Sequence, residues 1–295
     1  PVLLQEVVDV LHPSPGQCFI DATANGGGHT FALWERVKPN GMILAIDKDR
    51  DLIDRLAKEA RERKANVAAV CGSYGDLAAI ASAHHAANVA GILFDLGYSS
   101  YHIDLSGRGF SFQKDEPLFM RYESGERERE GMTAAEAVKQ LSEQELADVI
   151  YRYGEERLAR RIARAICMER KKERILTTKQ LADIVARAYP KKAFSRINPA
   201  TKTFQALRIF VNQELAELEK ALPQARDIVM EGGVVAVITF HSLEDRIVKR
   251  FFQSEKNKSM NSITKKPIVP TVQEADENRR ARSAKLRAAV KIHTQ

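Results

Sequence analysis

Few cysteines and short apolar runs limit what this 295-residue chain can be. Cys18, Cys71 and Cys167 are odd in number and far apart, which argues against a disulfide framework and favours a reducing compartment. No stretch approaches the roughly 18 uninterrupted apolar residues of a membrane span. The opening PVLLQEVVDVL lacks the basic start and the cleavage site of a signal peptide. We therefore expect a cytoplasmic protein with no membrane partner.

Several ligand-binding motifs are also missing. No Gly-Lys-Ser/Thr follows the glycine cluster at 26–28, so the chain has no P-loop. The dinucleotide fingerprint G-x-G-x-x-G, started at Gly26, would need a glycine where Phe31 stands. His84 and His85 lie in an alanine-rich helical pattern without matching ligands, so we expect no metal site.

The composition is that of an ordinary globular protein, with 44% hydrophobic and 29% charged residues. The length allows one large domain or two. The formal net charge of +7 and a pI near 9.3 favour a polyanionic partner.

Strand-like and helical patterns alternate over the first hundred residues. The clearest helical pattern spans 49–64, with its apolar residues on one face. Buried strands that alternate with helices are typical of βαβ units and of a parallel sheet covered on both faces. The expected strands are 18–23, 42–47, 67–72, 91–97, 234–240 and, at a sheet edge, 285–292.

The segment after residue 130 changes character. Capping-box patterns at 133–136, 142–145 and 177–180 predict three successive helices, with no strand between them. From Phe204, leucines and valines recur every three or four residues as far as Leu222, which predicts one long helix. We therefore expect an α/β domain in two parts, 1–125 and 204–295, with an inserted helical domain at 126–203 that recognises the substrate.

The three consecutive glycines follow the first expected strand, where an open α/β sheet binds ligands. Asp47 ends the second strand, 21 residues after Gly26, and a carboxylate there would accept hydrogen bonds from ribose hydroxyls. S-adenosylmethionine needs close backbone approach and a ribose acceptor but no phosphate cradle. It therefore fits this turn better than a dinucleotide, although a purely structural glycine turn stays open.

Residues 21–30, DATANGGGHT, resemble the D-x-T-x-G-x-G-G-H-[ST] motif of the bacterial small-subunit ribosomal RNA cytosine-N4 methyltransferases, the RsmH/MraW family. Segments along the whole chain are similar to its other signatures: 1–11, 95–104, 108–121, 198–215, 240–252 and 282–287. The chain departs from the family pattern where Asn25 replaces glycine, His102 glutamine, and Phe119 aspartate. Asn25 should preserve the turn, because asparagine tolerates a left-handed backbone.

The resemblance implies a class I methyltransferase with a Rossmann-like, mainly parallel sheet and S-adenosyl-L-methionine as its cofactor. Carried over position by position, it implies these cofactor contacts: Gly27, Gly28, His29, Asp47, Tyr74, Asp95 and His102. Taken alone, His29 could be a helix-start residue and Tyr74 a core aromatic.

Chemistry at the fourth strand favours methylation of an amine. Methylation of cytosine carbon 5 needs a cysteine nucleophile, and the three cysteines lie in strand or helix patterns without a convincing site. Residues 95–98 have the spacing of the Asp-Pro-Pro-Tyr loop of amino-group methyltransferases. Asp95 is a candidate acceptor for the target amine or the cofactor, and Tyr98 a candidate stacking partner for a flipped base.

A third catalytic candidate, His241, lies in FHSLEDR, just after a buried strand. A helix start with Ser242 as cap and Asp245 closing the turn would explain most of this segment. That helix start does not account for His241. With an ordinary pKa of about 6.5, His241 is a candidate to relay a proton or to contact the target nucleotide.

Three basic groups, at 151–174, 190–202 and 279–287, are candidate phosphate contacts, although each could be a solvated surface. The family resemblance makes 16S ribosomal RNA the expected partner, within the small subunit, and a homodimer is left open.

The leading hypothesis is S-adenosylmethionine-dependent methylation of the N4 amino group of a cytidine in the decoding region of 16S ribosomal RNA. Two alternatives remain. One is methylation of a different acceptor: DNA, transfer RNA or a protein. The other is a non-catalytic RNA-binding assembly factor whose cofactor pocket has decayed. The departures from the family pattern at Asn25 and Phe119 favour this alternative.

Overall fold

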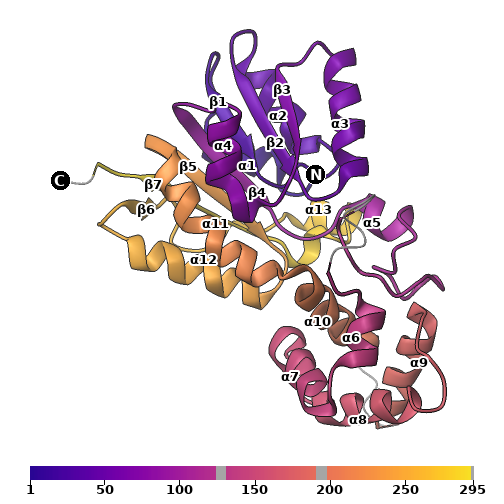
Figure 1. The fold of residues 1–295 in the computed structure, drawn as a ribbon. Helices are drawn as coiled ribbons and strands as arrows, with labels where there is room; N and C mark the ends of the chain where they lie inside the picture. The colour runs from indigo at the N-terminus through magenta and orange to yellow at the C-terminus, as the bar shows by residue number, and fades with distance from the viewer. Residues whose placement is uncertain (124–130, 191–197, 294–295) are drawn as a thin grey trace. The chain divides into compact units, whose positions relative to one another are not determined.

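The computed structural model describes residues 1–123, 131–190 and 198–293 (Figure 1). Contacts between residues divide the chain into two compact units. The first unit comprises Pro1–Gly97 and Leu215–Gln295, and the second comprises Tyr98–Glu214. The insertion expected from the sequence, 126–203, is shorter than this second unit. The expected domain limits stay a prediction.

The first unit is built on a seven-stranded sheet in the order β3-β2-β1-β4-β5-β7-β6. The first five strands of this order are parallel, and β7 runs antiparallel to both β5 and β6. The expected mainly parallel α/β sheet is therefore confirmed. The strands are β1 Cys18–Asp21, β2 Met42–Asp47, β3 Val67–Cys71, β4 Val89–Asp95, β5 Val229–Thr239, β6 Met260–Ser262 and β7 Lys285–Lys291.

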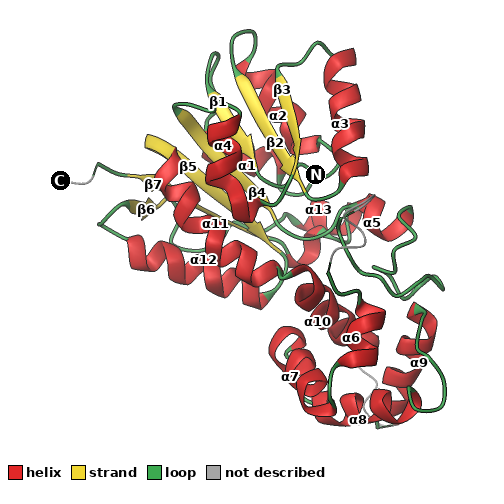
Figure 2. Ribbon diagram, in the orientation of Figure 1, coloured by secondary structure: helices red, strands yellow, loops and turns green. Residues whose placement is uncertain are grey.

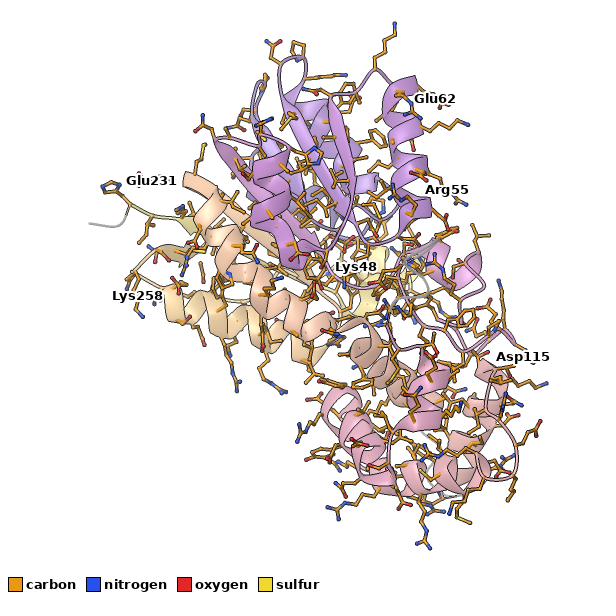
Figure 3. The ribbon with its side chains drawn as sticks, in the orientation of Figure 1. Lys48, Arg55, Glu62, Asp115, Glu231 and Lys258 are labelled. Atoms are coloured by element: carbon orange, nitrogen blue, oxygen red, sulfur yellow. The ribbon has the colours of Figure 1, made fainter. Side chains whose placement is uncertain are left out.

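Helices cover both faces of this sheet (Figure 2). Alternate residues of β2 point to opposite faces, so Ile43 packs with α1 and α2 while Leu44 packs with α4, α11 and α12. On α3, Arg55 and Glu62 project outward (Figure 3). The helices of this unit are α1 Leu4–Leu11, α2 Gly28–Val37, α3 Arg50–Glu62, α4 Leu77–Ala83, α11 Glu214–Ile228, α12 Ser242–Glu255 and α13 Val272–Glu277.

Two details of the sheet differ from expectation. β5 begins at Val229, five residues before its predicted start, because the EGG segment lies within the strand and bulges away from β4. Gly232 has φ 77°, which suits glycine at such an irregularity. The expected edge position of 285–292 is wrong, because the short strand β6 pairs with the outer side of β7. β6 itself was not predicted, since its three residues are too few for a periodic pattern.

The second unit is built from helices packed around their own apolar core (Figure 2). They are α5 Ser100–Asp104, α6 Ala134–Gln140, α7 Glu143–Gly154, α8 Ala159–Glu169, α9 Thr178–Ala188 and α10 Ala200–Asn212. The three predicted capping boxes all form, with Thr133, Ser142 and Thr177 as N-caps. An additional helix, α8, lies between the second and third of them and has no side-chain cap.

The predicted single helix from Phe204 is wrong, because two helices occupy that stretch. Gln213 has φ 52°, so the backbone turns left-handed there and ends α10 before α11 begins. Apolar residues keep their spacing on both sides of Gln213, which is why periodicity did not reveal the break. Among the described residues, no helix has the length and apolarity needed to cross a membrane.

Candidate active site

Three aspartates end three neighbouring strands of the first unit. Asp21 is the last residue of β1, Asp47 of β2 and Asp95 of β4. β1 lies between β2 and β4, so the strand order reverses there. Ligands of open α/β sheets bind at the carboxyl ends of the strands beside such a reversal. The structure therefore brings Asp47 and Asp95 together with the glycine turn, as the sequence predicted.

Asn25 ties this turn to both neighbouring strands. Its φ of 48° is left-handed, which confirms that asparagine can hold the turn. Its backbone N–H donates to Asp47 Oδ2 at 2.8 Å, and its side-chain amide donates to the carbonyls of Thr23 and Asp95 at 3.2 and 3.4 Å. The residue that departs from the family pattern thus supports the turn.

The three glycines have different reasons to be glycine. Gly27 has φ 78°, and a Cβ there would lie 2.7 Å from Leu56 Cδ1. A Cβ on Gly28 would lie 3.0 Å from the ring of Pro1. A Cβ on Gly26 would meet no atom within 4 Å. Packing and backbone conformation therefore explain Gly27 and Gly28, whereas Gly26 leaves open space above the turn.

Asp47 is held in one orientation by two backbone donors. Oδ2 accepts from Asn25 N, and Oδ1 accepts from Asp49 N at 2.9 Å. The side chain stays half-buried, and each oxygen can accept a second hydrogen bond. An oriented carboxylate of this kind suits a pair of adjacent ribose hydroxyls.

His29 and Asp95 form the least satisfied polar pair of the site. His29 lies in the first turn of α2 with 5% of its surface exposed, and its Nε2 is 3.5 Å from Asp95 Oδ2. Within the described part of the chain, neither ring nitrogen of His29 nor Oδ1 of Asp95 has a hydrogen-bond partner. Buried polar atoms are normally paired, so these three atoms indicate a ligand.

Asp21 is a site residue that the sequence reasoning missed. It is fully buried, and its Oδ2 accepts from Thr30 Oγ1 at 2.6 Å. Burial raises the pKa of this carboxyl to about 6, although the hydroxyl of Thr30 and the nearby His29 act to lower it. Its position at the head of the 21–30 motif was the available signal.

Tyr74 follows β3 in a 3-10 turn, Tyr74–Asp76, and packs edge-on against Phe94 with ring centroids 5.8 Å apart. This contact places it on the core, and its predicted contact with adenine stays a prediction.

His241 is the N-cap of α12, so the expected cap at Ser242 is wrong. His241 Nδ1 accepts from the backbone N–H of Glu244 at 3.3 Å, and its Nε2 lies 3.1 Å from Glu244 Oε1. Glu244 in turn accepts from the backbone of Phe240 and His241. An imidazole can cap a helix because its unprotonated nitrogen is a hydrogen-bond acceptor. A proton relay through His241 stays a prediction.

Tyr98 belongs to the second unit and lies on a buried ion pair. Arg208 donates to both oxygens of Glu214 at 2.9 Å, and its guanidinium carbon is 4.8 Å from the Tyr98 ring centroid. Burial disfavours the charged guanidinium, but the Glu214 carboxylate more than offsets this, so the pKa of Arg208 is raised. Tyr98 itself is 38% exposed and offers ring surface to a partner. Nothing in the sequence indicates that Arg208 and Glu214 lie beneath Tyr98.

His102, also in the second unit, is 1% exposed. Its Nδ1 accepts from Ser99 N at 3.1 Å in the capping box of α5, and its ring packs on Phe110 and Tyr122 with centroids 5.1 Å away. These contacts give the residue a structural role, and its contact with the cofactor stays a prediction.

Some side chains of the three basic groups bind partners within the protein itself. Lys285 and Arg287 pair with Asp245 at 3.3 and 2.7 Å, which lowers the pKa of that carboxyl against the effect of its burial. Arg170 donates to the carbonyls of Val138 and Leu141. Most of the basic segment 190–202 lies outside the described residues.

The site of the first unit fits S-adenosylmethionine on chemical grounds. Asp47 supplies an oriented acceptor, Gly26 leaves open space beside it, and His29 and Asp95 carry unpaired polar atoms. No phosphate cradle is required, because this nucleoside carries no phosphate.

Comparisons with known proteins agree with this reading. The profile of the MraW methylase family matches residues 1–292. The ribosomal RNA small subunit methyltransferase H of Persephonella marina is 43% identical over 294 residues, covering 99% of this chain and 98% of that protein. The protein of the same name from Deinococcus radiodurans is 47% identical over 288 residues, covering 97% and 88%.

A crystal structure from Clostridium thermocellum, described as a candidate rRNA methylase, matches with a TM-score of 0.50 at 13% identity, covering 99% of this chain and 98% of that chain. At this identity it supports the fold alone, that of a class I methyltransferase. The match of the family profile over almost the whole length, together with these relatives, shows that the chain belongs to the MraW methylase family.

Proposed function

We propose that this protein methylates the exocyclic N4 amino group of a cytidine in the decoding region of 16S ribosomal RNA. The curated relatives are named as methyltransferases of small-subunit ribosomal RNA, which supports the acceptor. The family resemblance of the motifs supports the N4 position and the decoding region.

One observation carries the chemistry. Unpaired polar atoms of His29 and Asp95 lie at the carboxyl end of β4, beside a bare glycine turn and the oriented Asp47. When bound, S-adenosylmethionine supplies an electrophilic methyl group on a sulfonium centre. Asp47 would hold its ribose, and the backbone at Gly26 would let it approach closely.

The amine of cytosine is a poor nucleophile, because its lone pair is delocalised into the ring. Asp95 is suited to accept a hydrogen bond from that amine, since its Oδ1 lacks a partner among the described residues. Such a bond would help the nitrogen to pyramidalise and direct its lone pair at the methyl group. Tyr98 would stack on the base and fix its plane.

Methylation at carbon 5 is disfavoured by the state of the cysteines. Cys71 lies at the ligand end of the sheet, but its thiol donates to the Lys48 carbonyl at 3.6 Å. Burial raises the pKa of Cys18, which disfavours a thiolate nucleophile there.

We propose that the substrate is 16S ribosomal RNA within the small ribosomal subunit, and that the reaction takes place in the cytoplasm. The three cysteines form no disulfide, which fits the reducing compartment expected from the sequence. A homodimer remains a proposal from the sequence.

Methyl transfer from labelled S-adenosylmethionine tests the function, with undermethylated small subunits, naked DNA and transfer RNA as competing acceptors. We expect label on small subunits only. The Cys71→Ala variant is the matched control and should retain its activity. If the labelled methyl group appears on DNA or on transfer RNA instead, the proposed acceptor is wrong. Binding of the subunit without any transfer would favour an assembly factor.

A further inference from the structure

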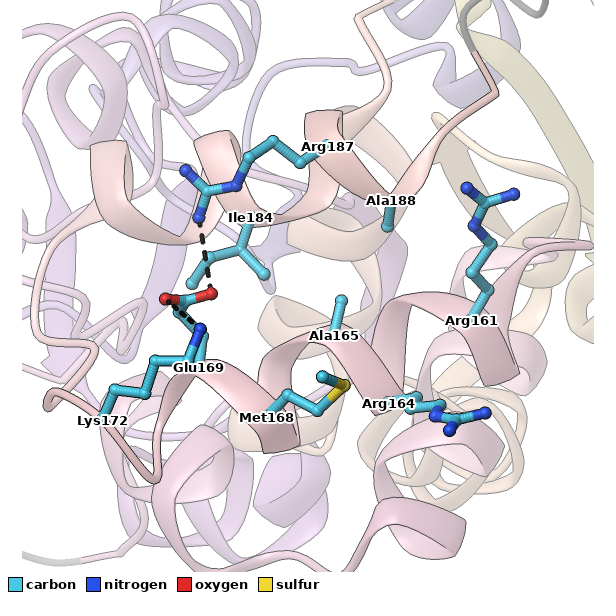
Figure 4. Close-up of a pocket in the computed structure, with 9 residues that line it drawn as sticks. All are labelled: Arg161, Arg164, Ala165, Met168, Glu169, Lys172, Ile184, Arg187 and Ala188. Carbon is cyan, nitrogen blue, oxygen red and sulfur yellow. Dashed lines mark hydrogen bonds and ion pairs between the residues drawn. The ribbon is translucent and has the colours of Figure 1, made fainter.

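A pocket opens between α8 and α9 of the second unit (Figure 4). α8 contributes Arg161, Arg164 and Met168, whose spacing of three and four residues puts them on one helix face. α9 contributes Ile184 and Arg187. The pocket uses none of the residues assigned to the candidate active site.

The charge of the pocket is strongly positive. Lys172 also lines it, and Glu169 is the one acidic residue among the nine lining residues. Glu169 Oε1 lies 3.4 Å from Lys172 Nζ, and its Oε2 lies 3.8 Å from Arg187 Nη2. Dashed lines mark both ion pairs in Figure 4. Arg161 and Arg164 have no ion pair or hydrogen bond with any residue that the structure describes. Two cations are therefore available to an anionic partner.

The pocket also offers apolar surface. Ile184 is 4% exposed and lies in its wall, and Met168 is 55% exposed. Methionine is flexible and adapts to flat partners. A free phosphate ion would use the arginines but would leave this apolar surface in water. A nucleotide combines an anionic phosphate with a flat, largely apolar base, and so matches both features.

We propose that this pocket binds one unpaired nucleotide of small-subunit ribosomal RNA, outside the methylated base. Arg161 and Arg164 contact its phosphate, and the base lies against Met168 and Ile184. The inference rests on the proposed function for the identity of the RNA. Arg170, from the same basic segment, donates to backbone carbonyls of its own unit and is therefore occupied. No described residue occupies Arg161 or Arg164 in this way, which supports a role for them in binding the phosphate.

The test compares two double variants of the full chain with the same change in charge. R161A/R164A removes the pocket cations, and R160A/K171A removes two exposed cations that do not line the pocket. Affinity for naked 16S ribosomal RNA is measured against salt, together with methyl transfer to small subunits. All four side chains are exposed, and thermal unfolding checks that both variants fold.

We expect the pocket variant to bind at least about tenfold more weakly and to raise KM with kcat little changed. The slope of log affinity against log salt should fall by roughly 0.7 to 0.9, since the two arginines contact one phosphate and each phosphate contact contributes about that much. The control variant should change much less. M168E should also weaken binding, whereas M168L should not.

Equal losses in the two double variants would overturn the pocket while leaving the proposed function intact. Weaker binding to assembled subunits but not to naked RNA would assign the pocket to a protein partner and overturn it as well. Absence of methyl transfer by the unmodified protein would instead refute the proposed function, and the inference with it.

Discussion

Substitution of alanine for Gly26 or Gly27 separates folding from cofactor binding at adjacent positions. The two changes add the same methyl group to the same turn. In the structure, the added Cβ at Gly27 meets Leu56 Cδ1 at 2.7 Å and the Phe31 ring at 3.0 Å. At Gly26 it meets no atom within 4 Å.

The expected cost for G27A is in stability. Its φ of 78° costs an L-residue about 1 to 2 kcal/mol. Crowding of a well-packed site costs a further 1 to 3 kcal/mol, roughly. We therefore expect the free energy of unfolding to fall by about 2 to 5 kcal/mol, with a matching fall in the midpoint of chemical denaturation.

The expected cost for G26A is in affinity. Its stability should change by less than about 1 kcal/mol, because the new methyl group meets nothing and also restricts the unfolded chain. If the open space above Gly26 receives the adenosine, the dissociation constant for S-adenosylmethionine should rise at least about tenfold.

Urea unfolding of both variants gives the free energy of unfolding, and calorimetric titration gives the dissociation constant for S-adenosylmethionine. A G26A variant that is stable and binds the cofactor normally would refute the assignment of this turn to the cofactor. A G27A variant as stable as the unmodified protein would refute the packing argument.

Three further changes test other parts of the site. D47A should raise the dissociation constant for S-adenosylmethionine by at least about tenfold by titration, as one or two charged hydrogen bonds are lost; unchanged affinity would remove Asp47 from the site. D21N should stabilise the protein relative to the unmodified chain as pH rises. The pKa of Asp21 is about 6 in the folded state and near 3.8 when unfolded, so its favourable contribution is complete below pH 3.8 and lost by about pH 6. That loss amounts to about 3 kcal/mol, and a difference in unfolding free energy that does not vary with pH would contradict it. E214Q should cost about 3 to 5 kcal/mol in urea unfolding, because Arg208 would keep a buried charge without its carboxylate. A loss below about 1 kcal/mol would show that water already screens this pair.

Local chemistry made much of the fold predictable. β2 and the capping boxes at Thr133, Ser142 and Thr177 were placed correctly, because their signals lie within a few neighbouring residues. The placement of Asp47 and Asp95 at the same edge of the sheet also followed, since parallel strands end at one edge.

Features that depend on tertiary packing were not predictable. Gln213 breaks a helix that periodicity continues, and a left-handed glutamine has no signature in sequence. His241 caps α12 through a ring nitrogen, a choice fixed by its contact with Glu244. The burial of Asp21 depends on α2 packing over β1, and the Arg208–Glu214 pair under Tyr98 depends on the fold of the second unit.

The position of the transferred methyl group decides whether this protein methylates an exocyclic nitrogen. Undermethylated small subunits are incubated with the protein and methyl-deuterated S-adenosylmethionine, and the ribosomal RNA nucleosides are resolved by mass spectrometry. We expect deuterated N4-methylcytidine with the unmodified protein and none with the D95A variant. Deuterium on carbon 5, on a ribose, or on no nucleoside at all would contradict it.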